Sequence, residues 1–278
     1  MTATSSPEWS DLAERTEASA MRRLMTDQPD AVVEALGVSA SALADGVHTA
    51  VVRDPMWGYW NKALGFCEPI TEATVAEAVE RAVRVGVSMF AIQVQPKALP
   101  EEWEAIVEAH GLTRGTTFVK CFGPAVPRRV ETDLRIARLE PEHAAAFTAV
   151  MAVGFGFEET TEAHAFFDGP QYFSGDWASY GAFDGDTLVG AARMLAVPET
   201  GSVAIFGAAT VPEGRNRGAQ AALLDARIRE AADRGLGFAS AETWLEDAEH
   251  RNPSQHNLSR AGLTEVHTRP NWVWRAGA

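Results

Sequence analysis

Cysteine is scarce in this chain of 278 residues, since it occurs only at Cys67 and Cys121. Two cysteines are too few for a disulfide framework or for a cysteine-rich zinc site. The seven histidines are scattered, and no HExxH or comparable metal-ligand spacing occurs. The sequence therefore predicts a protein that binds no metal and works in a reducing compartment.

Long apolar runs are missing as well. No stretch reaches the length of a membrane span. Residues 1–30 lack the basic start and the apolar core of a signal peptide. We therefore expect no membrane partner and a cytoplasmic location.

Positive charge is in short supply. The chain carries 24 Lys and Arg against 38 Asp and Glu, which gives a formal net charge of −14. Such a surface repels phosphate backbones and disfavours nucleic-acid binding over a broad face. An acidic pocket for an amine substrate agrees with this sign but is not implied by it, because acidic surfaces mostly just keep proteins soluble.

The chain is long enough for two modest domains, each with its own core. Residues 123–133 (GPAVPRRVETD) combine two prolines, a glycine and mixed charges, which is typical of a linker. We therefore predict a first domain at residues 1–125, a linker at 126–132 and a second domain at 133–278.

Hydrophobic periodicity divides the second domain into elements in the order β-α-α-β-β-β-α-β-α-β. Asp184-Gly185 is expected to turn a hairpin, and Gly235 to end a helix. The predicted strands are residues 134–139, 179–183, 187–197, 203–211, 238–245 and 266–274, and the predicted helices are residues 141–153, 158–167, 218–234 and 253–261.

The first domain repeats the end of this pattern. A strand at 88–94, a helix at 101–109 and a strand at 116–122 are predicted, and in both halves a helix leads through Gly-Leu-Thr into an aromatic strand. So short a match also arises by chance, but the shared order of elements favours an internal duplication.

A loop rich in arginine and glycine joins a strand to a helix at residues 210–224 (TVPEGRNRGAQAALL). The first N–H groups of a helix have no partner within it, and the helix dipole favours an anion there. Glycine would let a phosphate approach without a Cβ in the way. The alternative is a capped loop with solvated arginines. The predicted phosphate site consists of Arg215, Asn216, Arg217, Gly218, Ala219, Gln220 and Ala221.

This segment resembles motif A of the GCN5-related N-acetyltransferases (GNAT), which reads (Gln/Arg)-x-x-Gly-x-(Gly/Ala). Arg215 and Gly218 match, and Gln220 departs from the pattern. The segment SQHNLSRAGL at 254–263 resembles the fourth helix of that fold and the Gly-Phe after it. The resemblance covers the second half well, and the first half only as a partial copy, as in tandem GNAT proteins.

The resemblance implies an α/β (α+β) fold, a mixed sheet whose fourth and fifth strands splay apart. A C-terminal GNAT domain would follow a degenerate N-terminal GNAT-like half. The co-substrate would be acetyl-CoA or another acyl-CoA, with its pantetheine arm on the main chain of Ala209 and Val211 and a contact from Asn257. No Arg-x-x-Gly loop opens a helix in residues 1–125, and after Val94 the chain reads QPKALP. The first half is therefore expected to bind no cofactor.

Acyl transfer to an amine needs a base, a donor to the oxyanion and a proton for the thiolate. Glu242, flanked by small and apolar residues in the strand that faces the gap, is the predicted base; a salt bridge with an arginine is the alternative. Many GNAT enzymes carry a tyrosine acid four residues before the glycine of Gly-Phe, where this chain has Leu258. Tyr172 and Tyr180 are other candidates, and the spacing selects neither.

The acceptor is expected to meet residues 154–177, which are rich in aromatics and include Glu158, Glu159, Glu162 and Asp168. The leading interpretation is an acyltransferase that modifies the amine of a small molecule. A donor on an acyl carrier protein or an aminoacyl-tRNA is one alternative, and a catalytically silent CoA-binding regulatory module is another.

Overall fold

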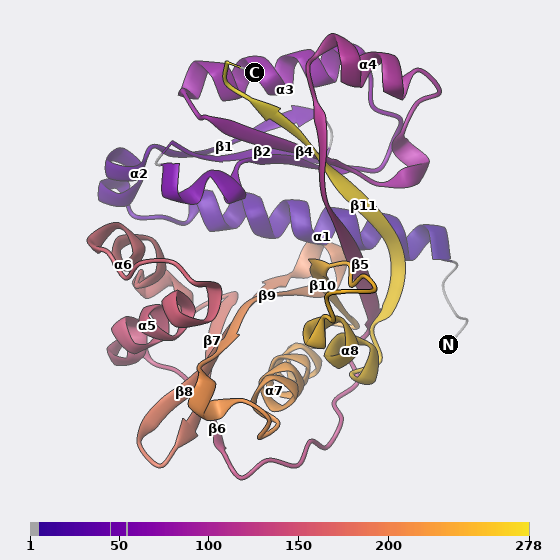
Figure 1. Ribbon diagram of the computed structural model, residues 1–278. Coiled ribbons are helices and arrows are strands. Elements are labelled where there is room, and N and C mark those ends of the chain that lie inside the picture. Colours follow the sequence, from indigo (N-terminus) through magenta and orange to yellow (C-terminus); the bar gives the residue numbers. More distant parts are fainter. Residues whose placement is uncertain (1–5, 45, 54, 278) are drawn as a thin grey trace. The chain divides into compact units, whose positions relative to one another are not determined.

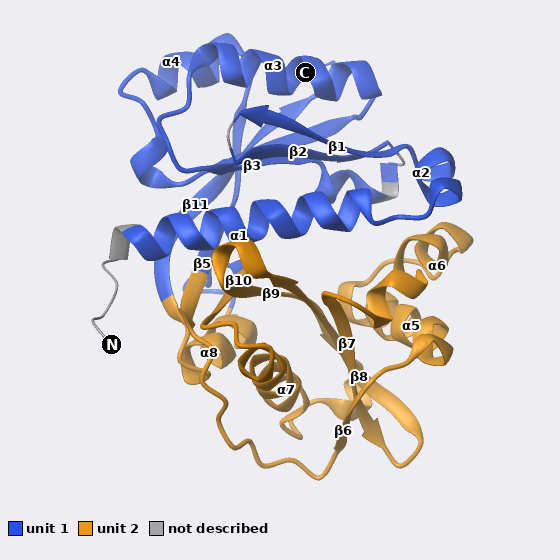
Figure 2. Cartoon of the chain, turned by 180° about the vertical axis from the view of Figure 1, so that it is seen from behind, with its two compact units in different colours: residues 1–120, 243–250, 265–278 blue, residues 121–242, 251–264 orange. Residues whose placement is uncertain are grey.

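The structure is a computed structural model that describes residues 6–44, 46–53 and 55–277. It divides into two compact units that interleave along the sequence (Figure 2). Unit 1 contains residues 1–120, 243–250 and 265–278, and unit 2 contains residues 121–242 and 251–264. Each unit has helices packed on its strands.

Unit 1 has the strand order β1-β2-β3-β4-β11-β5, in which β3 and β4 run parallel. Helix α1 packs on β1, β2 and β3, and α3 lies on the opposite face with α4 (Figure 1). The helices are α1 (Ser6–Thr26), α2 (Asp30–Leu36), α3 (Glu72–Val85) and α4 (Trp103–Ala109), and the strands are β1 (Val38–Ala44), β2 (Val47–Val52), β3 (Lys62–Phe66), β4 (Met89–Val94), β5 (Thr113–Pro124) and β11 (Thr264–Arg275).

Unit 2 has the strand order β10-β9-β8-β7-β6, in which β9 and β10 run parallel. Helices α5 and α6 lie on one face of this sheet and α7 on the other (Figure 1). The strands are β6 (Arg135–Arg138), β7 (Trp177–Asp184), β8 (Thr187–Val197), β9 (Ser202–Thr210) and β10 (Phe238–Trp244), and the helices are α5 (Ala144–Phe155), α6 (Thr161–Phe167), α7 (Ala219–Asp233) and α8 (Pro253–Arg260).

The predicted elements of the second half are all present, for the expected local reasons. Asp184 pairs with Thr187 across the turn of the β7–β8 hairpin, where Gly185 adopts φ 59°. Helix α7 ends at Gly235, which has φ 76° and donates its N–H to Ala232. Helix α8 begins at Asn252, whose side chain accepts from two N–H groups of the first turn.

The last strand of the second half belongs to unit 1, and the last strand of the first half ends in unit 2. β11 pairs antiparallel with β4 in unit 1, with Trp272 opposite Ile92. The ring of Trp272 packs edge-on against Trp103 at 5.4 Å in the core of unit 1. The end of β5 lies in unit 2, where Phe122 stacks on Phe238 at 5.3 Å. Unit 2 therefore differs from the predicted domain at 133–278, because strand pairing places residues 265–278 in unit 1.

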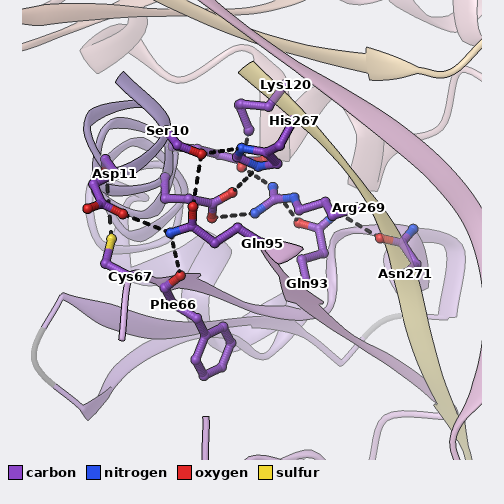
Figure 3. A network of polar contacts seen from close by, with 12 residues as sticks. Ser10, Asp11, Phe66, Cys67, Gln93, Gln95, Lys120, His267, Arg269 and Asn271 are labelled. Carbon is purple, nitrogen blue, oxygen red and sulfur yellow. Dashed lines mark hydrogen bonds and ion pairs between the residues drawn. The ribbon is translucent and has the colours of Figure 1, made fainter. Parts of the chain in front are cut away.

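Buried charges join α1 to β11 inside unit 1 (Figure 3). Arg269 is fully buried and pairs with Glu14 and Glu17, and Lys120 also pairs with Glu17. His267 Nε2 lies 2.9 Å from Glu14 Oε1. Burial opposes the ionisation of Glu14, but Arg269 and the hydrogen bond to His267 hold its pKa below the ordinary value. The first and last elements of unit 1 are thus tied by compensated buried charges.

Candidate functional site

Strands β9 and β10 separate part-way along their length. Their parallel pairing runs from Ser202 with Phe238 to Ile205 with Ala241 and stops there. At the same point the pairing of β9 with β8 shifts, because Gly207 is an extra residue with φ 56°. This is a β-bulge, which bends and twists the strand that carries it. The sheet therefore opens beyond Ile205 on its β10 side.

The bulge decides which main-chain groups of β9 face this opening. Val211 donates its N–H to Val189 on β8 at 3.0 Å. Alternate residues of a strand direct their N–H and C=O to the same neighbour, so Ala209, opposite Ala191, also faces β8. Ala208 and Thr210 face the opening instead. The main-chain groups that face the opening are therefore those of Ala208 and Thr210, whereas the sequence predicts a role for those of Ala209 and Val211.

Helix α7 begins without a side-chain cap. Gly218 occupies the N-cap position with φ 79°, and its carbonyl accepts from Ala222. Within the part of the chain that the structure describes, no hydrogen bond is recorded for the N–H groups of Ala219, Gln220 and Ala221. Three such donors and the helix dipole could hold an anion, which is the role that the sequence predicts for this loop.

Glycine is required at 218 for a reason other than the approach of a phosphate. Its φ of 79° disfavours any side chain, and a Cβ there would lie 2.9 Å from the carbonyl oxygen of Glu131 in the linker. The preceding Asn216 also has a positive φ, of 60°. The loop is thus shaped by its contact with the linker, which is held further by a hydrogen bond from Thr132 to the Arg217 carbonyl at 2.7 Å.

The two loop arginines do not point at the helix N-terminus. Arg217 binds Asp133 at 2.6 Å and Asp184 at 2.7 Å, and this guanidinium lowers the pKa of both carboxyls. Arg215 donates to the Thr210 carbonyl at 3.3 Å. The side-chain contribution to phosphate binding predicted for Arg217 therefore requires these ion pairs to be exchanged.

Gln220, which departs from the motif, directs its side chain to α8. Its amide donates to Ser254 at 2.7 Å and accepts from Asn257 at 2.5 Å. Arg260 in turn donates to the Asn257 oxygen at 2.5 Å. Asn257 therefore links α8 to α7, and the carrier contact predicted for it requires these bonds to be exchanged.

A cavity of about 310 Å³ lies on one side of α7, and a second of about 290 Å³ lies between α7, α8 and the linker. The residues that line the second cavity include Ala221, in the first turn of α7, and Ala261, directly after α8. Three arginines line it, namely Arg128, Arg129 and Arg260. A basic cavity beside an uncapped helix N-terminus suits the phosphorylated end of a nucleotide.

Comparisons with known proteins identify the fold. No protein-family model matches the sequence, and no curated protein matches it. Among solved structures, a GCN5-related N-acetyltransferase from Kribbella flavida matches with a TM-score of 0.65 at 14% identity, over 95% of this chain and 96% of that one. Another from Sphaerobacter thermophilus matches with a TM-score of 0.58 at 15% identity, over 98% and 95%. A tandem GNAT protein from the clavulanic acid biosynthesis pathway matches with a TM-score of 0.55 at 14% identity, over the same shares.

The chain has a tandem GNAT fold. The predicted α/β class and the mixed sheet with its splayed strands are confirmed, and β9 and β10 are the splayed pair. Among the residues described, no helix is long and apolar enough to cross a membrane. The described residues also contain no group of three or more His, Cys, Asp or Glu side chains that could hold a metal ion.

Glu242 lies at the opening of the GNAT sheet. It follows Ala241, the last residue of β10 that pairs with β9, and it is half-buried. The two tyrosine candidates for proton transfer are buried in contacts of their own. Tyr180 donates to Glu230 at 2.8 Å, which together with burial raises its pKa, and Tyr172 is fully buried beneath Arg193. Leu258 is a buried core residue of α8.

The predicted acceptor region contains a histidine that sequence reasoning missed. His164 on α6 contacts Asp168 at 2.8 Å through Nδ1 and Glu159 at 2.9 Å through Nε2, and Asp168 also accepts from Thr148. The hydrogen bond to Asp168 raises the pKa of His164. The charged imidazole therefore ties α6 to its flanking loops below this raised pKa, and the support is lost as the pH rises through it.

Unit 1 has a counterpart of the splayed strands, but there the side chain of Gln95 bridges the two strands. The equivalents of β9, β10 and α7 are β3, β4 and α3, so the loop that corresponds to motif A is residues 67–71 (CEPIT), not the QPKALP segment. The loop has one acidic residue and no arginine. Gln95 follows β4 and donates to the Phe66 carbonyl and to Asp11, both at 2.9 Å, while accepting from Ser10 (Figure 3). This bridge lies where a carrier would pass between the strands.

Proposed function

We propose that the chain is an N-acyltransferase that moves an acetyl or related acyl group from acyl-CoA to the amine of a small molecule. The observation that carries this proposal is the alignment of two features in unit 2. The main chain of Ala208 and Thr210 faces the opening of the sheet, and the uncapped N–H groups of α7 follow directly after it. An extended pantetheine arm and a diphosphate match these two features in that order.

The cavity between α7 and α8 favours coenzyme A as the carrier. Its three arginines suit a phosphorylated nucleoside, which a carrier protein does not present at this place. An aminoacyl-tRNA would need a broader basic surface than a chain of net charge −14 supports. Acyl-CoA is therefore the donor that agrees best with both the local and the overall charge.

The reaction forms a C–N bond and breaks a C–S bond. Glu242 takes the proton that the amine loses, and an N–H that faces the opening, such as that of Ala208, stabilises the developing oxyanion. The thiolate leaves and regains a proton through water, since Tyr172 and Tyr180 are engaged elsewhere. The acceptor amine approaches from the side of α5 and α6.

A catalytically silent CoA-binding module is the second candidate. It is favoured by the absence of a side-chain acid at Leu258, which is buried in the core. Both candidates require the same carrier site, and they differ only in turnover.

Coenzyme A is expected to raise the melting temperature in proportion to the logarithm of its concentration, because it binds only the folded state. Thermal unfolding measured with CoA, dephospho-CoA and pantetheine should give the largest shift with CoA. Arg129→Gln should weaken the binding of CoA by roughly fivefold, the scale of one partly exposed charge contact.

The matched control is Arg84→Gln, on the exposed surface of α3 and outside the basic cavity. It should bind CoA as the wild type does. If the folded wild type keeps the same melting temperature at millimolar CoA, the proposal is wrong. An equal shift with pantetheine would remove the role assigned to the basic cavity.

A further inference from the structure

Arg227 is a buried cation on α7 that the proposed chemistry leaves unused. Its side chain is 2% exposed. Nε donates to the Leu223 carbonyl at 3.0 Å, and Nη1 lies 3.2 Å from the Arg193 carbonyl and 3.4 Å from that of Phe206. No ion pair with a carboxylate is recorded for it among the residues described.

Stability alone does not account for this residue. Burial without a carboxylate partner disfavours the charged guanidinium and lowers the pKa of Arg227 to about 9. A well-packed apolar side chain usually serves a buried position as well as a buried charge does, or better. What an apolar side chain cannot supply is the pair of hydrogen bonds to main-chain carbonyls.

Those two carbonyls belong to the bulge. Arg193 on β8 and Phe206 on β9 are opposite each other, and they are the last pair before the extra residue Gly207. A bulge disrupts the hydrogen bonding of the two strands locally. Arg227 therefore supplies donors from α7 at the point where the register of β8 and β9 changes.

The same point is held from the other face of the sheet. The Arg193 side chain is 2% exposed and stacks on Tyr172 at 3.7 Å and on Phe147 at 4.2 Å. It also donates to Ser179 at 3.2 Å. The residue whose carbonyl Arg227 binds is thus fixed by its own side chain, so the bulge is clamped between α7 and the helices α5 and α6.

The register matters for function because strand side chains and main-chain groups alternate with a period of two. With Gly207 as the extra residue, Ala208 and Thr210 face the opening of the sheet. A shift of one residue would direct Ala209 and Val211 there and turn the first pair towards β8.

We propose that Arg227 is a positioning residue for acyl transfer: it holds the bulge at Gly207 and so sets which main-chain groups of β9 meet the acyl carrier. The proposal rests on the proposed acyltransferase function. Arg227 touches neither donor nor acceptor and acts through the carbonyls of Arg193 and Phe206.

The test compares Arg227→Met, Arg227→Lys and the matched control Arg229→Met on the exposed side of the same helix. Turnover is measured with acetyl-CoA and a panel of small primary amines, well below the melting temperature of each variant. Arg227→Met should lower kcat by about 10- to 100-fold, the scale of a small misplacement of reacting groups, with a smaller change in KM. Arg227→Lys should recover part of kcat, since an ammonium still donates to one carbonyl, and Arg229→Met should match the wild type.

Amide hydrogen exchange of Gly207 and Ala208 gives a readout that does not depend on coenzyme A. Exchange at these two residues should quicken in Arg227→Met while the rest of β9 stays protected. A folded Arg227→Met with wild-type kcat and unchanged exchange would overturn the proposal. If the wild type itself fails to bind CoA, the acyltransferase function is wrong, and unchanged exchange in Arg227→Met would then separately refute the clamp.

Discussion

Replacing Arg269 with methionine is expected to lower the free energy of unfolding by about 3–5 kcal/mol, the scale for removing one partner of a buried ion pair. Glu14 and Arg269 are both fully buried, so the variant leaves a carboxylate without its main compensating charge. Glu17 keeps Lys120 as a partner and contributes less to the loss. Urea unfolding at neutral pH measures the difference.

Two further results would show that this loss of stability comes from the uncompensated charge of Glu14. The destabilisation should shrink in acid, because protonation of Glu14 removes the uncompensated charge. The double variant Glu14→Gln/Arg269→Met should be more stable than the sum of the two single losses predicts. If Arg269→Met does not accumulate as folded protein, Glu14→Gln alone should still show the lost partner as a lower urea midpoint.

Arg275→Met is the matched control, since Arg275 lies on the same strand and is exposed. It should unfold at the wild-type urea midpoint. Equal stability of Arg269→Met and Arg275→Met would contradict the claim that buried charges tie α1 to the exchanged strand β11.

Replacing Glu242 with glutamine should reduce turnover by roughly a hundredfold or more, the usual scale for the loss of a general base. Binding of CoA should stay nearly unchanged, because the N–H groups of Ala219 to Ala221 lie elsewhere on the chain. The acidic limb of the pH–rate profile should flatten, since a base must lose its proton before it can act. Steady-state rates with acetyl-CoA and the best amine of a panel measure all three.

Glu199→Gln is the control for this experiment. Glu199 is exposed just before β9 begins, at the end of the strand that stays paired with β10. It should leave kcat and the pH profile as they are. Wild-type turnover in Glu242→Gln would move the base to the acidic segment at 158–176 or to water.

Local signals predicted most of unit 2. Apolar periodicity, the Asp184-Gly185 turn and Gly235 at the end of α7 are properties of neighbouring residues, and each is confirmed. The strand, loop and helix at 210–224 predict an anion site from local residues as well. The helix start without a side-chain cap is observed, and it depends on the loop alone.

The pairing of strands that lie far apart in the sequence was not predicted. The placement of β11 beside β4 joins residues about 180 positions apart, and nothing in either strand encodes its partner. The bulge at Gly207 reverses the faces of β9 and so redirects the prediction from Ala209 and Val211 to Ala208 and Thr210. The ion pairs of Arg217 could not be read from the sequence either, because its partners, Asp133 and Asp184, lie 84 and 33 residues away.

Calorimetric titration of the full chain with coenzyme A tests the central claim most directly. One carrier site is expected, in unit 2, because the uncapped N–H groups of α7 and the opening of β9 and β10 have no usable counterpart among the described residues of unit 1. There the loop at 67–71 lacks arginine, and Gln95 bridges to the Phe66 carbonyl. The account predicts a stoichiometry of one CoA per chain; no binding, or a stoichiometry near two, would contradict it.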